Sequence, residues 1–158
     1  MANAREAMKG MPHNAVNVRA TMAHHPDLAR AFGGFTGFVL NEASTPRRQR
    51  ELVILRMGWN CQAEYEFGQH TLYGLANGVT EDEIRAVTRP LSQHSWSTED
   101  RILLQMTDDL HTDDCVSDAT WADLTAHWTT PEITEFVMAA LCYRAVSGFL
   151  NSFGVERD

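Results

Sequence analysis

Apolar residues recur along this chain with the three-to-four-residue period of amphipathic helices, and no segment alternates with the two-residue period of strands. The most apolar segment opens with Thr45 as the predicted N-cap and Pro46 as the first helical residue, and it runs to about Trp59. Its apolar side chains cover most of a helix circumference, which predicts a central, buried helix. These residues are Leu52, Val53, Ile54, Leu55 and Met57.

Capping residues and prolines mark most of the other helix boundaries. Asn14 is a candidate cap, Thr80 and Glu83 form a capping-box pattern, and Gly78 suits a left-handed helix terminus. The sequence therefore predicts an all-α fold of about eight helices in a single domain over residues 1–158. The predicted helices cover about 14–23, 26–40, 46–59, 62–77, 80–89, 97–110, 117–128 and 131–153, with a loop at 111–116.

Three glycines interrupt the second predicted helix, where Gly33, Gly34 and Gly37 alternate with phenylalanines. Each costs a helix about 1 kcal/mol relative to alanine, so their presence needs a reason. Close packing of another helix is the first interpretation, and room left for a ligand is the second.

The charge of the chain limits its partners. A formal net charge of −8 argues against a nucleic acid or an anionic membrane surface, because both attract basic residues. The densest basic group, Arg47, Arg48 and Arg50, is too short for a binding stripe and is interpreted as a solvated helix face. The longest purely apolar run, 136–142, is far shorter than the roughly 20 residues of a membrane span.

The cysteines and the N-terminal stretch indicate the compartment. Cys61, Cys115 and Cys142 are widely spaced and contain no CxxC, which is typical of a reducing compartment. The stretch MANAREAMKGMPHNAV has no continuous apolar core of signal-peptide length. We therefore expect a soluble, cytoplasmic protein.

The candidate chemistry lies between residues 50 and 78. Glu66 precedes His70 by four residues, so the two side chains share one helix face, and Glu51 heads the apolar helix before it. A carboxylate beside an imidazole raises the affinity of the imidazole for its proton and orients the ring, which makes a general acid or base. A solvated surface pair is the alternative for Glu66 and His70. If the two helices pack together, Glu51, Glu66 and His70 converge at one pocket.

A wider set of residues resembles the carboxymuconolactone decarboxylase superfamily, which includes the alkylhydroperoxidase D-like proteins. The matching residues extend over about 30–90 and comprise Arg50-Glu51-Leu52-Val53-Ile54-Leu55, Asn60, Glu64-Tyr65-Glu66, His70, Leu75-Ala76-Asn77-Gly78-Val79 and Glu81-Asp82-Glu83-Ile84. The resemblance implies an alkylhydroperoxidase D-like helical bundle, assembly into homo-oligomers (commonly trimers or hexamers), and a proton relay that includes Glu51 and His70.

The chain departs from the peroxidase branch of that family at two positions. The two cysteines of its CxxC correspond here to Ala63 and Glu66. Peroxide reduction by a dithiol requires two neighbouring sulfurs, so we do not expect thiol peroxidase activity. Cys61 has no visible resolving partner and is interpreted as a structural thiol. The decarboxylase-like branch, which also has a Tyr-Glu pair before its His, resembles this chain better.

That branch implies a cofactor-free lyase acting on a small carboxylated lactone or a related metabolite. His70 would donate the proton, Glu66 would tune it and Glu51 would complete the relay. Candidate substrate-binding residues are Arg50 and Arg56, with surface arginines as the alternative, and Trp59 and Tyr65, with plain core packing as the alternative. We predict no metal site, because the ligand-like residues within 111–115 fall in a predicted loop, where Asp and Thr form turns.

Two other functions stay open: an isomerase, hydratase or cyclase using the same Glu/His pair, and a non-catalytic oligomeric binding protein. The helical extension over about 97–153 is expected to cover the pocket and to build the oligomer interface. A degenerate second copy of the helical unit is the alternative, because Thr130-Pro131 repeats the opening of the earlier helix.

Overall fold

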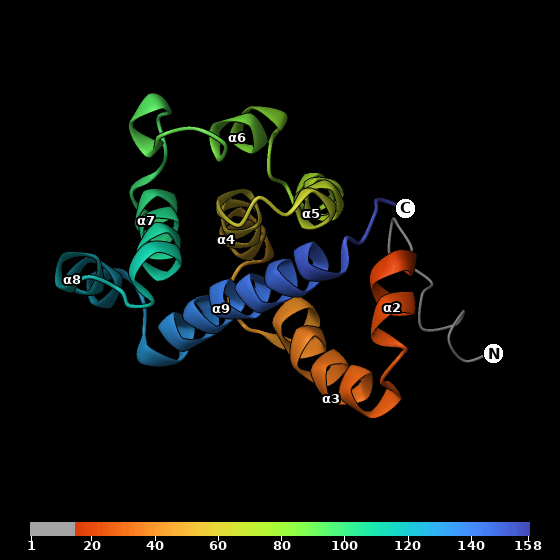
Figure 1. Cartoon of the computed structure of the whole chain (residues 1–158). Coiled ribbons are helices and arrows are strands. Elements are labelled where there is room, and N and C mark those ends of the chain that lie inside the picture. Colours follow the sequence, from red (N-terminus) through yellow and green to blue (C-terminus); the bar gives the residue numbers. More distant parts are fainter. Residues whose placement is uncertain (1–14) are drawn as a thin grey trace.

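The computed structural model describes residues 15–158, and all regular structure within them is helical. This confirms the predicted all-α fold (Figure 1). The described part contains eight α-helices, a π-helical turn η1 and a 3₁₀ turn η2: α2 (Val16–Met22), α3 (Pro26–Gly37), η1 (Phe38–Glu42), α4 (Arg47–Asn60), α5 (Glu64–Ala76), α6 (Glu81–Ala86), η2 (Leu91–Gln93), α7 (Thr98–Asp113), α8 (Asp118–His127) and α9 (Thr130–Phe153). The predicted cap Asn14 lies outside the described residues.

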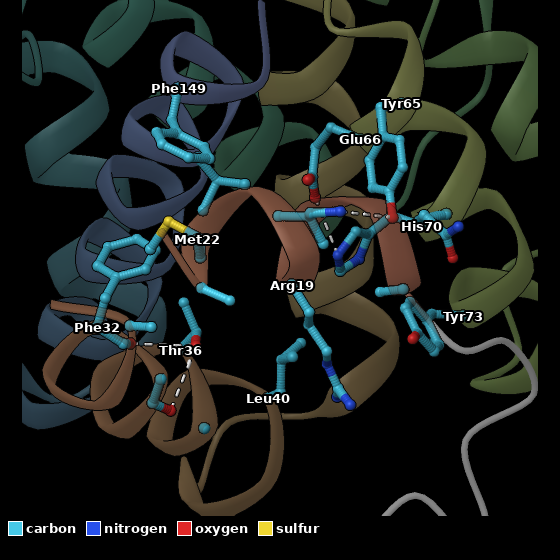
Figure 2. A pocket seen from close by; sticks show the side chains of 18 of the residues that line it. Arg19, Met22, Phe32, Thr36, Leu40, Tyr65, Glu66, His70, Tyr73 and Phe149 are labelled. Atoms are coloured by element: carbon cyan, nitrogen blue, oxygen red, sulfur yellow. Dashed lines mark hydrogen bonds and ion pairs between the residues drawn. The ribbon is translucent and has the colours of Figure 1, made fainter. Parts of the chain in front are cut away.

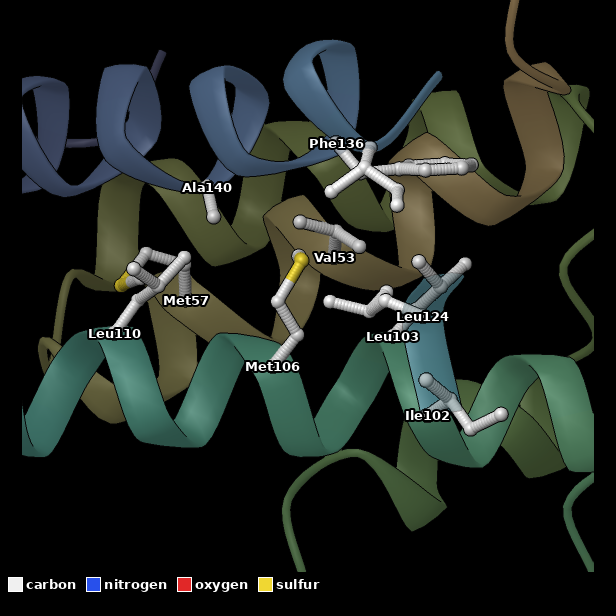
Figure 3. Packing of buried hydrophobic residues seen from close by; sticks show 10 residues of the cluster. Val53, Met57, Ile102, Leu103, Met106, Leu110, Leu124, Phe136 and Ala140 are labelled. Carbon is white, nitrogen blue, oxygen red and sulfur yellow. The ribbon is translucent and has the colours of Figure 1, made fainter. Parts of the chain in front are cut away.

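Helix α4 is the centre of the fold. It packs against α5, α7 and α9, and every residue from Arg50 to Gly58 is buried. Figure 3 shows Val53 of α4 between Phe136 of α9 and Met106 of α7. The central position follows from apolar side chains on all sides of the helix, which no single neighbour can cover.

The C-terminal half supplies most of this packing. Helix α9 runs along α4, α7 packs against both of them, and α8 packs against α7 and α9 (Figure 1). Among the described helices, only α9 is long and apolar enough to cross a membrane, and half of its most apolar stretch is buried inside the protein. Its apolar character is therefore accounted for by its contacts with α4, α5 and α7.

Several predicted boundaries are confirmed, and three are wrong in detail. The capping box of Thr80 and Glu83 is present, and Gly78 has a positive φ of 92°. Pro46, not Thr45, occupies the N-cap of α4. Helix α9 is capped by Thr129 through a capping box, one residue earlier than expected. The loop predicted at 111–116 is shorter, since α7 continues to Asp113.

Helices α2 and α3 form an arm, residues 16–37, that contains no buried residue. The arm lies beside α9 and near the end of the chain (Figure 1). A Cβ built at Gly33, Gly34 or Gly37 would meet no atom within 4 Å. Close helix packing is therefore the wrong interpretation of these glycines, because open space lies beside all three.

Candidate functional site

Glu51, Glu66 and His70 meet where α4 packs against α5. His70 Nδ1 lies 2.7 Å from Glu51 Oε2, across the two helices, and His70 Nε2 lies 3.0 Å from Glu66 Oε1, one turn earlier on α5. Glu66 and His70 are each only 4% exposed. The interpretation of Glu66 and His70 as a solvated surface pair is therefore wrong.

The two carboxylates determine the charge of the imidazole. Burial alone would lower the pKa of His70, but the negative charges of Glu66 and Glu51 on either side raise it to about 10. His70 is therefore an imidazolium at neutral pH, with a proton on each ring nitrogen. Glu51 accepts the Nδ1 proton in a hydrogen bond, which fixes the orientation of the ring.

The contact with Glu66 has a different character. Nε2 and Oε1 are close enough for an ion pair, yet Oε1 has no hydrogen-bond partner among residues 15–158. Glu66 Oε1 is thus a buried acceptor held by charge but without a donor aligned to it.

A cavity of about 520 Å³ opens above this pair (Figure 2). Glu66 and His70 line it, whereas Glu51 lies behind the ring and outside the lining. Its walls are mostly apolar and come from α2, α3, η1 and α9, with Met22, Phe32, Leu40, Val146 and Phe149 among them. A volume in this range accommodates a small organic molecule.

The glycines of α3 widen this cavity. Gly33 and Gly37 line it and Gly34 does not. The room-for-ligand interpretation therefore fits the two lining positions. The extension over 97–153 contributes one wall of the cavity through α9, but the side opposite His70 is covered by the N-terminal arm.

Four further residues beside His70 were not identified from the sequence. Arg19, Gln69 and Tyr73 line the cavity, and the ring of Tyr143 packs edge-on against His70. Tyr73 also packs against His70, with ring centroids 5.2 Å apart. The i, i+3 spacing of His70 and Tyr73 on α5 was a usable signal. Arg19 and Tyr143 come from distant helices, and no local pattern connects them to His70.

The structure places Arg50 and Arg56 away from the cavity, and neither is a surface residue. Arg50 donates hydrogen bonds to the carbonyl oxygens of Leu40, Ala43 and Thr45, which fastens the turn before α4. The predicted solvated face is therefore wrong for Arg50. Arg48 is partly exposed, and it pairs with Glu83 and Asp100.

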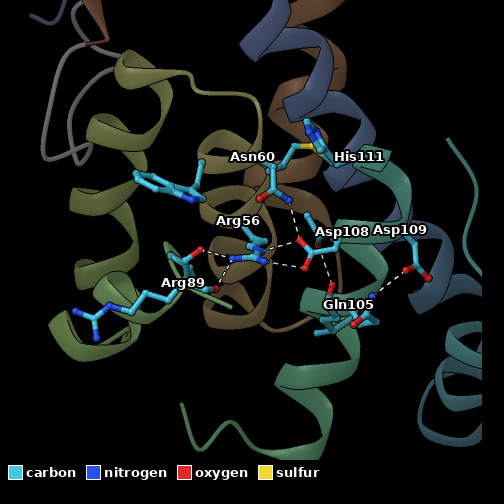
Figure 4. A network of polar contacts seen from close by, with 12 residues as sticks. Arg56, Asn60, Arg89, Gln105, Asp108, Asp109 and His111 are labelled. Carbon is cyan, nitrogen blue, oxygen red and sulfur yellow. Dashed lines mark hydrogen bonds and ion pairs between the residues drawn. The ribbon is translucent and has the colours of Figure 1, made fainter. Parts of the chain in front are cut away.

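Arg56 is the centre of a separate polar network (Figure 4). Its guanidinium donates to both carboxylate oxygens of Asp108, at 2.7 and 2.8 Å, and to the carbonyls of Val87 and Arg89. Asn60 donates to the same Asp108 carboxylate. Arg56 thus ties α4 to α7 and to the turn after α6, and its donors are used there.

The two aromatic candidates, Tyr65 and Trp59, lie in different places. Tyr65 lines the cavity and donates a hydrogen bond from its hydroxyl to Asp158 Oδ2 at 2.9 Å. Trp59 lies outside the cavity, in a shallow groove with Phe67, against which its ring packs edge-on.

No dithiol lies at the site. Ala63 is buried at the N-cap of α5, and Glu66 follows it on the cavity side. All three cysteines of the chain are free. Burial raises the pKa of Cys61 and, to about 12, that of Cys142, so neither thiol is activated by its surroundings.

A sequence model of the carboxymuconolactone decarboxylase family matches residues 26–98, which contain α3 to α6 and the whole Glu51–His70–Glu66 row. Residues 26–98 thus place this part of the chain in the carboxymuconolactone decarboxylase superfamily. No curated protein matches the sequence.

Solved structures of this superfamily's alkylhydroperoxidase D-like fold superpose over most of the chain. A protein of unknown function from Agrobacterium tumefaciens, proposed to be the antioxidant defence protein AhpD, has a TM-score of 0.81 and 16% identity over 87% of this chain and 95% of its own. A peroxidase-related protein with an AhpD core from Ralstonia eutropha JMP134 has a TM-score of 0.81 and 17% identity, over 90% and 76%.

A third similar structure is that of the debrominase Bmp8 in complex with 2,3,4-tribromopyrrole. Its TM-score is 0.82 with 14% identity, over 98% of this chain and 82% of its own. At such identities the three structures show the shared fold alone.

Proposed function

We propose that this protein is a cofactor-free acid–base enzyme that moves a proton at a carbon next to a carbonyl group. The observation that carries the proposal is the buried row Glu51–His70–Glu66, of which His70 and Glu66 line a mostly apolar cavity. An imidazolium and a carboxylate side by side at a mostly apolar cavity supply both a proton donor and a proton acceptor.

Each residue has a distinct role in this chemistry. Glu66 takes the proton from the carbon, and the electron pair of the C–H bond moves into the carbonyl to give an enolate. His70 donates from Nε2 to the enolate oxygen, since its Nδ1 proton is bound to Glu51. Glu66 then returns its proton to a second carbon, and His70 recovers its own from the oxygen. The net result is an isomerisation without any oxidant or reductant.

Decarboxylation, the reaction implied by the family resemblance, is the second candidate. Loss of CO₂ from a carboxylated lactone leaves an electron pair in the adjacent carbonyl, and His70 Nε2–H then protonates the carbon. A carboxylate substrate requires a cation to orient it. The expected arginines Arg50 and Arg56 do not line the cavity, and Arg19 does. Arg19 is thus the arginine that a carboxylate substrate would meet in the cavity, and the lyase stays the second candidate because neither expected arginine reaches the cavity.

Thiol peroxidase activity is not proposed, because Ala63 and Glu66 stand where the peroxidase branch has its cysteine pair. The complex of Bmp8 with 2,3,4-tribromopyrrole supports small ring compounds as ligands of this fold. We further propose cytoplasmic location and a homo-oligomer, a trimer or hexamer, in line with the family resemblance. The apolar side chains exposed on α5, Leu72 and Leu75, are candidate contacts between copies.

Solvent-deuterium exchange into cyclic ketones and enones, followed by NMR, tests the proton transfer without knowledge of the physiological substrate. We expect exchange with the native protein and a loss of at least about a hundredfold in His70→Ala, the scale of one general acid–base group. CO₂ release from 4-carboxymuconolactone, measured beside it, separates the lyase from the isomerase. Exchange that is equally fast with native and His70→Ala protein would refute the proposal.

A further inference from the structure

Two residues that line the cavity, Glu66 and His70, carry an acceptor and a donor side by side. Glu66 Oε1 is buried and has no aligned hydrogen-bond donor among the described residues, and it lies 3.0 Å from His70 Nε2. A second buried acceptor, Gln69 Oε1, is also without a partner within residues 15–158, and its residue lines the same cavity. Gln69 Nε2 donates to Asp158 Oδ2 at 2.8 Å, which settles the orientation of the amide.

Buried acceptors without donors are costly, so a ligand that supplies donors there gains binding free energy. A hydroxyl group does this and more, because it donates one hydrogen bond and accepts others. It can give its proton to Glu66 Oε1 while its oxygen accepts from His70 Nε2. A carboxylate cannot donate, an ammonium cannot accept, and an ether or ester cannot donate.

The charged groups at the base of the cavity also favour an uncharged ligand. Two carboxyl groups flank the one imidazole ring at the base of the cavity, and Glu66 lies on the cavity side of that ring, with Arg19 further along the wall. An anion placed against Glu66 would be repelled at low dielectric and would lose its hydration. The apolar walls from α3 and α9 match an uncharged ring body.

We propose that the physiological substrate is a neutral, apolar, ring-sized carbonyl compound, bound tightly as its enol, whose hydroxyl sits between Glu66 Oε1 and His70 Nε2. This proposal rests on the acid–base function proposed above and adds the class of substrate. A phenol has the shape and hydrogen bonding of such an enol, so a phenol on an apolar ring is the matching probe.

Three naphthalenes of nearly equal size provide the test on the native protein. 2-Naphthol donates and accepts, 2-methoxynaphthalene only accepts, and 2-naphthoate is an anion. We expect 2-naphthol, measured by calorimetry or by its fluorescence, to bind at least about tenfold more tightly than either of the others, the size expected of a hydrogen bond to a charged group. Equal binding of 2-naphthol and its methyl ether, or tighter binding of 2-naphthoate, would overturn the proposal.

A matched pair of variants on α5 locates the contact. Glu66→Gln keeps the shape but removes the charge from the acceptor, and should weaken 2-naphthol severalfold while leaving 2-methoxynaphthalene unchanged. Glu64→Gln, the same substitution on a side chain outside the cavity, is the control and should change neither. Thermal unfolding confirms that both variants fold. Equal effects of the two variants on 2-naphthol would contradict the assignment of Glu66.

The binding test and the turnover test can fail independently of each other. The naphthalene series involves no reaction, so its order holds even if the protein catalyses nothing. Deuterium exchange into 2-tetralone, a neutral ketone whose enol resembles 2-naphthol, joins the two proposals. Rapid turnover of 4-carboxymuconolactone with no exchange into 2-tetralone would support acid–base chemistry and overturn the neutral substrate class.

Discussion

The ring of Tyr143 packs edge-on against the ring of His70, with centroids 4.7 Å apart and planes inclined at 75°. The contact connects the middle of α9 to the proposed proton donor on α5. Tyr143 is itself buried in a cluster with Val39, Ile54 and Val146. Through this contact the C-terminal helix holds the imidazole from the side, while Glu51 holds it from behind.

The aromatic ring of Tyr143, and not its hydroxyl group, should be what holds His70 in place. Tyr143→Phe keeps the ring and should retain most of the stability and of the proton-exchange activity. Tyr143→Ala removes a buried aromatic ring and should lower the free energy of unfolding by about 3 kcal/mol or more. Urea unfolding and deuterium exchange into a ketone measure the two effects. Equal activity of the Ala and Phe variants would show that Tyr143 does not position His70.

The raised pKa of His70 predicts how stability changes with pH. His70 has a pKa of about 10 in the folded protein, against 6.5 for an ordinary histidine. Its stabilising contribution is therefore complete below pH 6.5 and is lost as pH rises through 10. In total it is on the order of a few kcal/mol. Between pH 7 and 9 the native protein should lose stability by about 1 kcal/mol per pH unit.

His70→Asn provides the comparison, because asparagine has no proton to lose. The difference in unfolding free energy between native and variant protein should shrink steadily from pH 7 to pH 9. Chemical denaturation at several pH values measures it. A difference that stays constant over this range would mean that His70 is neutral in the folded protein.

The glycines of α3 allow the cavity to be filled without disturbing the core. Gly33→Leu should place its side chain in the cavity and abolish binding of 2-naphthol. Gly34→Leu, one position along the same helix, points to open space outside the lining and should leave binding intact. Both variants should fold as well as the native protein, because neither Cβ meets an atom and each gains up to about 1 kcal/mol of helix propensity. Equal binding of 2-naphthol by the Gly33→Leu and Gly34→Leu variants would show that the cavity is not the binding site.

Arg56 should behave as a structural residue. Arg56→Met leaves Asp108 with only Asn60 as a side-chain donor and removes two contacts to backbone carbonyls. The partly buried carboxylate then lacks its counter-ion, so the free energy of unfolding should fall by about 2–4 kcal/mol. Ligand affinity, measured where the variant is folded, should be unchanged. The double variant Arg56→Met with Asp108→Leu should recover part of the stability.

Local signals predicted the helices well because each signal is contained within a few residues. Thr80 and Glu83 cap α6 as expected, and Gly78 ends the previous helix with a positive φ. The meeting of Glu51 with His70 followed from family resemblance combined with the burial of α4. The sequence alone carried no distance between the two side chains.

Other features depended on contacts that sequence spacing does not encode. Arg50 and Arg56 were taken for surface or substrate-binding side chains, because nothing in the pattern shows that backbone carbonyls and Asp108 use their donors. Arg19 reaches the cavity from an arm whose placement is determined by residues at the far end of the chain. The space beside Gly33 likewise appears only once α3 is folded against η1.

The arm is attached to the rest of the protein through Asp158. This residue accepts hydrogen bonds from the backbone of Val16 and Asn17 at the start of α2, and from Tyr65 on α5. Val18 of α2 also packs, partly buried, against the cluster that contains Tyr65. One carboxylate thus links α2 to the helix that carries Glu66 and His70, so the wall that α2 contributes to the cavity depends on Asp158.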